Sequence, residues 1–533
     1  MSPDGVDIRL RRPTWDPIPR GLPVRTRVRL GATVGVPLVI FYLYWLIDPS
    51  RIGNPILYAM LLCAELLNVI QAIGFWWTCA HERIREPKTP KQPVAVDVLI
   101  PRYDEPPEIV ELTVAAAAGL RGHDVRVWLL DDGNSPEMWQ IAEANGVGYI
   151  TRPVHDHAKA GNINNALNQV SAPYVAIIDC DHVVFPEFLE ATLGHFEEDE
   201  RLAFVQTPQY YANGDQPGVP GAAWHQQTLF FGAIARGKDG LGATFCCGTN
   251  VIFRRAALEE TGGFPTHSIT EDFALSITLH ERGWHTAYLP KILASGLGPE
   301  DMAAYTTQQL RWARGCLAAI PQIVTARLPW RLRAQYLLSG LYWLSGWTVL
   351  FYMAFPAVRI LFGVQPLAHL TAPIFLLHFS PYFLLALSTA ALAGAGSYTF
   401  GALALAASSF WVFIVASGLT VARRRSSFKV TPKTAANRRQ PRAVWPALAA
   451  IAFLTVVSVY GLAHSHTSAT YNNVAFALFH ICILLTGCWP ALRRPPQSSI
   501  GAAVPQAARP VSAPAPAPSA KAPSGTRADV MRP

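Results

Sequence analysis

The stretch Y-V-A-I-I-D-C-D-H, residues 174–182, decides the fold class of this chain. Its first five residues are aromatic or β-branched apart from one alanine, which predicts a short buried strand. Two aspartates and a histidine follow at once. Ligands of open α/β sheets bind beyond the carboxyl ends of the strands, so this order predicts an α/β domain with a polar site at that edge.

The residues before this stretch extend the pattern. Strands are predicted at V-A-V-D-V-L-I (94–100) and D-V-R-V-W-L-L (124–130). Helices are predicted at E-I-V-E-L-T-V-A-A-A-A-G-L (108–120), which a glycine ends, and at A-G-N-I-N-N-A-L-N-Q-V (160–170). Alternating strands and helices predict a parallel sheet covered by helices.

Acidic residues follow three of these strands. They lie in P-R-Y-D-E-P (101–106), in Asp131-Asp132-Gly133 and in Asp179-Cys180-Asp181-His182. Any one cluster could simply cap the next helix or turn. Three clusters at successive strand ends should converge on one edge, which favours a site. Neither G-x-G-x-x-G after the first strand nor G-x-x-x-x-G-K-[ST] occurs, so the usual dinucleotide and P-loop devices are absent.

The spacing D-x-D at residues 179–181 suits a hard cation. Two carboxylates at a strand end can share Mg²⁺ or Mn²⁺ and leave positions open for substrate phosphates. The cation could then neutralise a diphosphate leaving group. His182 is either a further ligand or a hydrogen-bonding histidine.

Two later motifs each allow two interpretations. Thr270, Glu271 and Asp272 open a helix in S-I-T-E-D-F-A-L-S, where they could be ordinary N-terminal capping residues. Q-Q-L-R-W-A-R-G (308–315) precedes an apolar stretch, so its tryptophan and arginine could be interfacial anchors. Alternatively, the arginine clamps phosphates and the indole stacks on a sugar.

The composition indicates a membrane protein with one soluble block. The chain has 533 residues, of which 51% are hydrophobic and only 15% are charged, whereas soluble domains carry about 25% charged residues. The mean hydropathy is +0.21. Most acidic residues lie between Glu82 and Asp301, so a soluble domain is predicted between membrane segments.

Seven apolar stretches reach the length of a span: residues 30–47, 55–79, 336–364, 370–393, 398–422, 443–463 and 471–491. If 398–422 crossed, A-R-R-R-S-S-F-K would lie outside, against the positive-inside rule. We therefore predict that 398–422 is an interfacial helix, that about six segments cross, and that both termini are cytoplasmic.

Other features exclude some classes. The net charge of +8 comes from basic residues beside apolar runs, which suits anionic lipid better than nucleic acid. The eight cysteines include no C-x-x-C pair, which argues against a disulfide framework or a structural zinc site. The first 28 residues do not resemble a cleaved signal peptide, and the last 40 or so, with repeated Ala-Pro, predict a disordered tail.

Taken in order, the motifs resemble processive family 2 glycosyltransferases of the cellulose synthase type. The matching pieces are I-P-R-Y-D-E-P, D-D-G, H-A-K-A-G-N, D-C-D-H, F-V-Q-T-P-Q-Y-Y, F-C-C-G-T-N, T-E-D, Q-x-x-R-W and F-K-V-T-P-K, between about Val94 and Lys433. The resemblance implies a GT-A-like α/β glycosyltransferase domain inserted in a polytopic α-helical membrane protein, with about six transmembrane helices plus interfacial helices.

The resemblance also implies a role for each matching residue. The nucleotide would be bound by Tyr103, Glu105, Asp132, Lys159, Asp179, Gln308 and Arg311. Mg²⁺ or Mn²⁺ would be held by Asp179, Asp181 and His182, and Asp272 would be the general base. Trp312 and Cys247 would face the acceptor. Phe428, Val430, Thr431 and Lys433 match F-x-V-T-x-K, a gating loop that closes over the nucleotide.

This resemblance divides the chain into nine parts. They are a cytoplasmic N-terminal segment (1–29), a transmembrane hairpin (30–80), the cytoplasmic glycosyltransferase domain (94–300), interfacial helices with Q-x-x-R-W (301–335), a hairpin (336–393), an interfacial helix (398–422), the gating loop (423–442), a third hairpin (443–492) and a Pro/Ala-rich tail (494–533).

The implied activity is processive, inverting polymerisation of UDP-glucose into a cellulose-like β-glucan, 1,4-linked, with translocation across the inner membrane. Its partners would be a UDP-sugar donor, the growing polysaccharide, the lipid bilayer and an export or periplasmic subunit, without nucleic acid. The alternatives are another polymer (β-1,3-glucan, mannan or a hyaluronan-like chain), a non-processive lipid-linked sugar transferase, and a transporter without catalysis.

Two features depart from the family pattern. Arg102 stands where Thr or Ser is common, and Asp104 where Asn is usual, which weakens the expected uridine contacts. No PilZ domain follows the last apolar stretch, so we do not predict binding of cyclic diguanylate despite the R-x-x-x-R spacing of Arg438 and Arg442.

Overall fold

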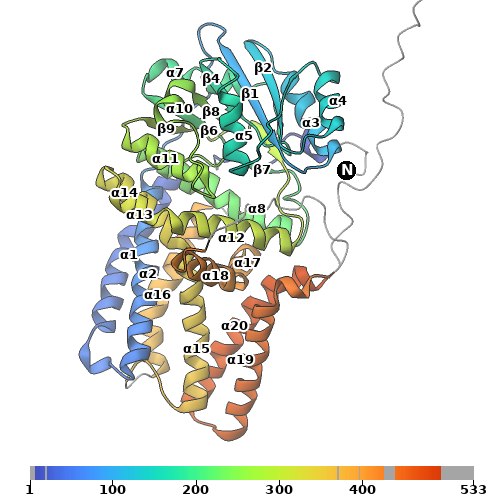
Figure 1. Ribbon diagram of the computed structural model, residues 1–533. Coiled ribbons are helices and arrows are strands. Elements are labelled where there is room, and N and C mark those ends of the chain that lie inside the picture. The colour runs from blue at the N-terminus through green and yellow to red at the C-terminus, as the bar shows by residue number, and fades with distance from the viewer. Residues whose placement is uncertain (1–6, 19–20, 369–370, 395–396, 425–438, 494–533) are drawn as a thin grey trace, which may run out of the picture.

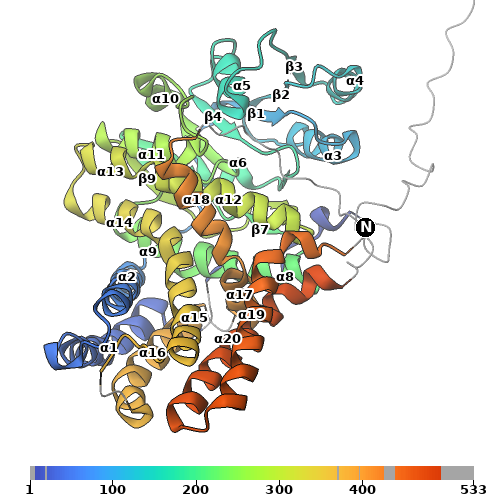
Figure 2. The same ribbon diagram turned by 60° about the horizontal axis from the view of Figure 1, so that its bottom comes forward.

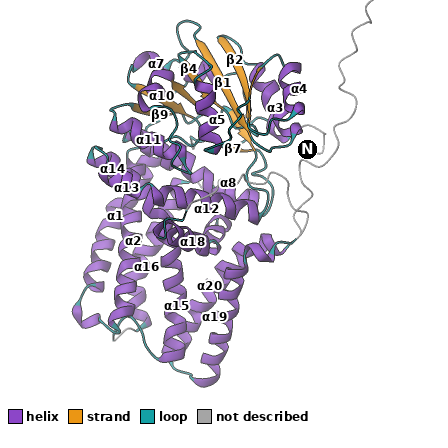
Figure 3. Cartoon of the chain, in the orientation of Figure 1, coloured by secondary structure: helices purple, strands orange, loops and turns teal. Residues whose placement is uncertain are grey.

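The computed structural model describes residues 7–18, 21–368, 371–394, 397–424 and 439–493. An α/β domain lies on one end of a bundle of long helices (Figure 1). Strands occur in the α/β domain alone among the described residues, as the colouring of Figure 3 makes plain.

Seven strands of the described chain form the central sheet, in the order β3-β2-β1-β4-β8-β6-β9. Their bounds are β1 Ala95–Arg102, β2 Asp124–Asp131, β3 Gly148–Ile150, β4 Tyr174–Ile177, β6 Leu202–Gln206, β8 Val251–Arg254 and β9 His285–Tyr288. A smaller sheet in the described residues has the order β5-β10-β7, with β5 Val183–Val184, β10 Ala294–Gly296 and β7 Tyr210–Tyr211. It lies beside the carboxyl end of β4, directly after the D-C-D-H segment.

The alternation of side chains along β1 places helices on both faces of the central sheet. Val98 faces one hydrophobic core together with α3 (Pro107–Ala118) and α4 (Pro136–Ala144). Leu99 faces the other core with α5 (Ala158–Leu167), α10 (Arg255–Thr261) and α11 (Glu271–Glu281). The predicted strands and helices of residues 94–178 are therefore confirmed, to within two or three residues at their ends.

The strands from the alternating stretch, β1 to β4, pair in parallel as predicted, but the complete sheet is mixed. Strand β8 runs antiparallel to both β4 and β6. The reason lies in the path of the chain: F-C-C-G-T-N (245–250) lies at the carboxyl edge of the sheet, so the strand that follows must run away from that edge. Strand β4 runs towards it and ends at Ile177, two residues before Asp179. The sheet is mixed, and its polar edge is still built from the ends of β1, β2, β4 and β6.

Six helices in the described chain are long and apolar enough to cross a membrane. They are α1 Val24–Leu46, α2 Pro55–Ala80, the continuous helical stretch Trp330–Phe362 formed by α14 (Trp330–Leu341) and α15 (Ser345–Phe362), α16 Ala372–Ala393, α19 Trp445–His464 and α20 Ser468–Leu492. These agree with the predicted number of spans. Their starts are set by local signals, for example Asn54, whose side chain accepts hydrogen bonds from the N–H groups of Ile56 and Leu57.

The stretch 398–422 forms two helices, α17 (Phe400–Ser408) and α18 (Phe410–Val421), bent by 43°. Figure 1 looks almost along α18, while α1, α2 and α15 run lengthwise down the bundle, and Figure 2 shows α18 extended beside α12 (Met302–Ala318). Helix α18 therefore lies across the end of the bundle, between it and the α/β domain. Its position relative to a membrane stays a prediction.

Candidate active site

A cavity of about 400 Å³ lies at the carboxyl edge of the central sheet. It is bounded by the ends of β1, β2 and β4, by the start of α11 and by α12. All twelve predicted site residues that the structure describes line it: Tyr103, Glu105, Asp132, Lys159, Asp179, Asp181, His182, Cys247, Asp272, Gln308, Arg311 and Trp312. The four predicted gating-loop residues, Phe428, Val430, Thr431 and Lys433, fall outside the described residues, as do Arg438 and most of the loop.

The two aspartates of D-D-G make different contacts. Asp131 is buried and stabilises the turn after β2, where it accepts hydrogen bonds from the backbone N–H groups of Gly133 and Ser135. Asp132 faces the cavity, and Arg152 holds it through two hydrogen bonds of 2.6 Å. Sequence reasoning missed Arg152. Its place directly after β3, at the same edge as the acidic clusters, is the signal that could have found it.

The loop after β1 is held by hydrogen bonds between its own side chains and its own backbone. Oε2 of Glu105 accepts hydrogen bonds from the N–H groups of Tyr103 and Asp104, at 2.9 and 3.2 Å. Arg102 donates to the carbonyl of Glu105 and pairs with Asp131 at 2.9 Å. The arginine that departs from the family pattern therefore ties this loop to the D-D-G turn, and it also lines the cavity.

Lys159, in the first turn of α5, contacts the D-C-D-H segment. Its Nζ lies 2.5 Å from Oδ1 of Asp179 and 2.8 Å from the carbonyl oxygen of Gly248. Burial alone lowers the pKa of Lys159, but the carboxylates of Asp179, Glu271 and Asp272 outweigh burial and raise the pKa above its ordinary value. This lysine stays charged and places a fixed cation beside the first aspartate.

Asp272 lies at the start of α11, and its Oδ1 accepts a hydrogen bond of 2.8 Å from the N–H of Phe273. Burial, and then the neighbouring charge of Glu271, raise the pKa of Asp272 to about 7. A carboxylate with a pKa near neutrality is suited to accept a proton in a reaction. Gly248 approaches it closely, with φ +85°, and a Cβ there would lie 2.9 Å from Oδ2 of Asp272, so this position requires glycine.

Helix α12 carries Gln308, Arg311 and Trp312 on one face, because residues three and four apart are neighbours on a helix. All three line the cavity. Gly315 lets α12 lie against the start of α11, since a Cβ there would meet the Thr270 side chain at 2.2 Å. The spacing Q-x-x-R-W-x-x-G therefore brings a cation and an indole close to Asp272.

Comparisons with known proteins support the resemblance to family 2 glycosyltransferases. A model of the family described as "Glycosyl transferase family group 2" matches residues 174–416. The chain contains a family 2 glycosyltransferase domain. Its sheet has a counterpart in a solved structure, the mannosyltransferase PcManGT from Pyrobaculum calidifontis in complex with GDP-Man and Mn²⁺, which covers 69% of this chain and 100% of its own at 16% identity, with a TM-score of 0.51. The fold of the glycosyltransferase domain is GT-A-like.

The chain is also similar in sequence to proteins named as cellulose synthase catalytic subunits. The UDP-forming cellulose synthase 1 catalytic subunit of Komagataeibacter xylinus is 40% identical over 291 residues, which are 53% of this chain and 38% of that protein. The UDP-forming cellulose synthase catalytic subunit of Komagataeibacter sucrofermentans is 36% identical over 370 residues, which are 66% of this chain and 48% of that protein. The chain spans less than half the length of these relatives.

The D-C-D-H segment of the glycosyltransferase domain fits a divalent cation. Asp179, Asp181 and His182 can each offer one ligand atom, with these atoms within 4.8 Å of one another. Carboxylate oxygens suit Mg²⁺ and Mn²⁺. The ring of His182 lies against Gly296 of β10, where a Cβ would approach ring atoms to 2.4–2.5 Å, and its Nδ1 lies 3.1 Å from Oδ1 of Asp181. The imidazole therefore lies within hydrogen-bond distance of the second aspartate, and which metal the set prefers stays a prediction.

A second cavity, of about 360 Å³, lies next to the first. Five residues line both: Gln209, Cys247, Thr270, Asp272 and Trp312. The second cavity lies between the glycosyltransferase domain and the helices α2, α8 (Val219–Leu229) and α14. Its lining combines amides and aromatic rings. The amides include Gln71, Gln226, Gln227, Gln309 and Gln335, and the aromatic residues include Phe230, Phe245, Tyr342, Trp343 and Tyr398.

Sequence reasoning missed this amide and aromatic lining. Gln209 is the clearest case, because its Nε2 donates a hydrogen bond of 2.7 Å to the carbonyl of Cys247 and so joins F-V-Q-T-P-Q-Y-Y to F-C-C-G-T-N. Both segments were recognised by resemblance, yet the glutamines of α2, α8 and α14 belong to no motif. Polar amides within otherwise apolar helices were the available signal.

Proposed function

We propose that this chain is a processive, inverting β-glycosyltransferase that polymerises UDP-glucose into a cellulose-like β-glucan, 1,4-linked, and passes the product into the membrane. One observation carries the proposal. The polar cavity with the acidic clusters and the amide and aromatic cavity beside the membrane-capable helices meet at Asp272 and Trp312. A donor in one and an acceptor in the other would meet at a residue suited to be the base.

We assign the donor to the first cavity. The relatives are named as UDP-forming enzymes, which indicates a UDP-sugar donor for them. The cavity of this chain offers groups for each part of a UDP-sugar. Tyr103, Glu105 and Asp132 would bind the uridine, and Lys159, Gln308 and Arg311 would lie along the diphosphate. Asp179 and Asp181 would hold Mg²⁺ or Mn²⁺, which when bound neutralises charge on the leaving diphosphate.

The chemistry needs one base. Asp272 would accept the proton of the acceptor hydroxyl while that oxygen attacks the anomeric carbon. The bond from this carbon to the diphosphate oxygen breaks in the same displacement, so an α-linked donor gives a β-glycoside. No second carboxylate has to act as nucleophile, and Lys159 and Arg311 would stabilise the charge left on UDP.

The second cavity suits a sugar chain. Aromatic faces pack against the apolar faces of pyranose rings, and amides offer both donors and acceptors to hydroxyl groups. Trp312 and Cys247 would contact the terminal unit, and the cavity leads towards α2 and α14. Transfer would push the polymer in this direction, so synthesis and export would be one process.

The gating loop is proposed to cover the nucleotide. Arg314 of α12 donates a hydrogen bond of 2.8 Å to the carbonyl of Arg424, which lies at the start of the loop and is its last described residue before position 425. The chain therefore enters the loop segment beside the helix that carries Gln308 and Arg311. Closure would exclude water and bring Thr431 and Lys433 near the diphosphate.

The inner (plasma) membrane is the proposed location, with the glycosyltransferase domain in the cytoplasm where UDP-sugars are available. Arg25, Arg27 and Arg29 in the first turns of α1, and Arg423 to Arg425 after α18 in the sequence, would then lie on the cytoplasmic side. An export or periplasmic subunit would receive the polymer on the other side.

Donor screening with linkage analysis tests the proposal. The full-length protein, purified into lipid nanodiscs, is supplied with radiolabelled UDP-glucose, UDP-N-acetylglucosamine, UDP-glucuronate or GDP-mannose, with Mg²⁺ or Mn²⁺. We expect high-molecular-weight product from UDP-glucose that a β-1,4-glucanase digests. Polymer from another donor alone, product resistant to that enzyme, or short lipid-linked product would each overturn the corresponding part of the proposal.

A further inference from the structure

The first described segment of the chain lies against the glycosyltransferase domain, although it is far in sequence from the motifs of that domain. We call residues 7–16 the N-terminal arm. Arg9 of the arm is only 2% exposed. Asp7 pairs with its guanidinium, at 3.0 Å between Nη2 and Oδ2. Burying a guanidinium costs several kcal/mol unless it is paired and hydrogen-bonded, so a specific use of the remaining donors is expected.

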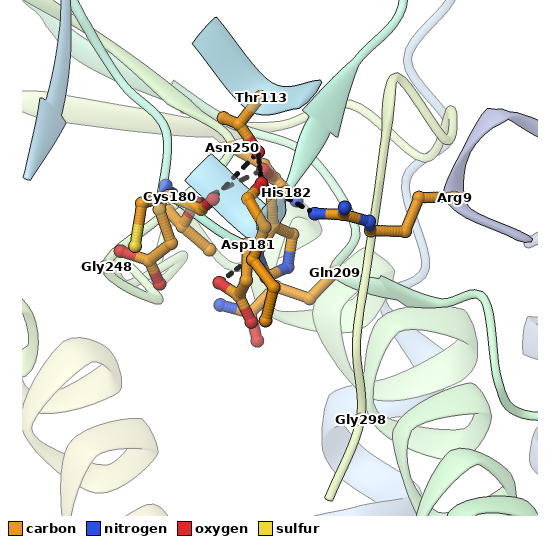
Figure 4. A network of polar contacts seen from close by, with 12 residues as sticks. Arg9, Thr113, Cys180, Asp181, His182, Gln209, Gly248, Asn250 and Gly298 are labelled. Carbon is orange, nitrogen blue, oxygen red and sulfur yellow. Dashed lines mark hydrogen bonds and ion pairs between the residues drawn. The ribbon is translucent and has the colours of Figure 1, made fainter. Parts of the chain in front are cut away.

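The remaining donor of Arg9 reaches the first turn of α3. Its Nη1 donates a hydrogen bond of 3.0 Å to the carbonyl of Ile109. The hydroxyl of Thr113 lies 3.5 Å from the same carbonyl oxygen and donates a hydrogen bond of 2.8 Å to the carbonyl of Cys180. Figure 4 shows the Arg9 side chain extending from the arm towards Thr113 and Cys180, with Asp181 and His182 beside them. The chain of contacts ends on the backbone between Asp179 and Asp181.

A second arginine of the arm contacts residues that follow the D-C-D-H segment in the chain. Arg12 lies over the ring of Phe185, at 4.8 Å from its centroid, and forms an ion pair with Glu187. These residues follow His182 by three and five positions. The arm is therefore linked to the D-C-D-H segment in two ways: Arg9 contacts α3, which bonds Cys180, and Arg12 contacts the chain just after the segment.

The far end of the arm packs against α8, a helix that also contributes to the lining of the second cavity. Trp15 packs edge-on against Trp224 of α8, with ring centroids 5.1 Å apart. Helix α8 also carries Gln226, which lines that cavity. Helix α1, the first membrane-capable helix, begins eight residues after Asp16, at Val24.

We propose that the N-terminal arm is a positioning element for the D-C-D-H segment, and that Arg9 and Arg12 are its positioning residues. Arg9 holds the first turn of α3, whose Thr113 fixes the carbonyl of Cys180, so that Asp179 and Asp181 present their oxygens together to a divalent cation and a nucleoside diphosphate. This inference rests on the proposed donor site, but not on which polymer is made.

Replacing Arg9 by Met tests the inference, because Met keeps much of the apolar stem and removes every donor. Binding of Mn²⁺ and of UDP is measured by titration calorimetry on the full-length protein in nanodiscs, and hydrogen exchange is followed in peptides covering residues 174–187. We expect UDP binding at limiting Mn²⁺ to weaken about tenfold, exchange of this segment to quicken, and kcat at saturating Mn²⁺ to change less than twofold. Arg9→Lys should recover part of the affinity.

Two further variants keep the test decisive. Thr113→Val removes only the donor to Cys180 while conserving shape, so it should reproduce the binding defect even if Arg9→Met folds poorly. Leu10→Ala, at an exposed position of the same arm, should bind UDP like the wild type. Wild-type UDP affinity in both Arg9→Met and Thr113→Val would overturn the inference. Normal UDP and Mn²⁺ binding by a wild-type protein that makes no polymer would instead count against the proposed function alone.

Discussion

The raised pKa of Asp272 makes its role testable by pH. A rise in pKa from 3.8 to about 7 corresponds to about 4 kcal/mol, because each tenfold change in a proton-binding constant is worth about 1.4 kcal/mol. The base must be ionised to act. We therefore expect kcat/KM to rise about tenfold per pH unit below pH 7 and to level off above it.

The same shift affects folding stability with a defined sign. Between pH 3.8 and 7 the folded protein binds a proton at Asp272 that the unfolded chain does not, so stability contributed by this group falls as the pH rises through that window. Asp272→Asn removes a carboxylate that is costly when ionised. The variant should lose 10²- to 10⁴-fold in transfer rate, yet unfold at a higher temperature than the wild type at pH 8 and differ little at pH 4.

Glu271→Gln is the matched control, because the charge of Glu271 is, after burial, the next cause of the raised pKa of Asp272. It should move the midpoint of the pH–rate profile below 7 without abolishing transfer. The measurements are initial rates from pH 5 to 8.5 and thermal scanning at both pH values in nanodiscs. A pH–rate profile that stays flat from pH 5.5 to 8, or an Asp272→Asn variant that still transfers sugar at the wild-type rate, would refute the assignment.

Three further predictions concern groups around the cavity. Lys159→Met leaves Asp179 without its cation, so we expect the dissociation constant for UDP to rise at least tenfold in titration calorimetry; an unchanged constant would remove Lys159 from the nucleotide site. Arg152→Leu leaves Asp132 buried and unpaired and should cost about 3–5 kcal/mol of stability, seen as a clear fall in Tm, whereas the more exposed Arg201→Leu should cost less than about 1 kcal/mol. Gly315→Ala should slow transfer and lower Tm by pushing α12 from Thr270, and Thr270→Ala added to it should recover part of both; equal damage in the double variant would contradict the contact.

The sequence by itself determined the local elements and the places where chemistry begins. Period-two and helical patterns give all the strands and helices of residues 94–178 except α4 and β3, and hydropathy gives seven apolar stretches, because both signals lie within a few neighbouring residues. The positive charges beside those stretches then reduce the predicted spans to about six. The acidic clusters could be assigned to one edge for a similar reason, since strand ends of an α/β sheet share that edge. The resemblance then supplied candidate roles, which the shared cavity makes testable.

Only the tertiary structure decided how these pieces meet. The sequence does not distinguish the neighbouring residues Asp131 and Asp132. In the structure, the side chain of Asp131 bonds the turn after β2, whereas that of Asp132 bonds Arg152. The antiparallel β8, the amides of the second cavity and the path from Arg9 to Cys180 likewise depend on contacts between residues tens to more than a hundred positions apart. Such contacts leave no local period in the sequence, because they are selected by packing and by the need to pair buried polar groups once the chain has folded.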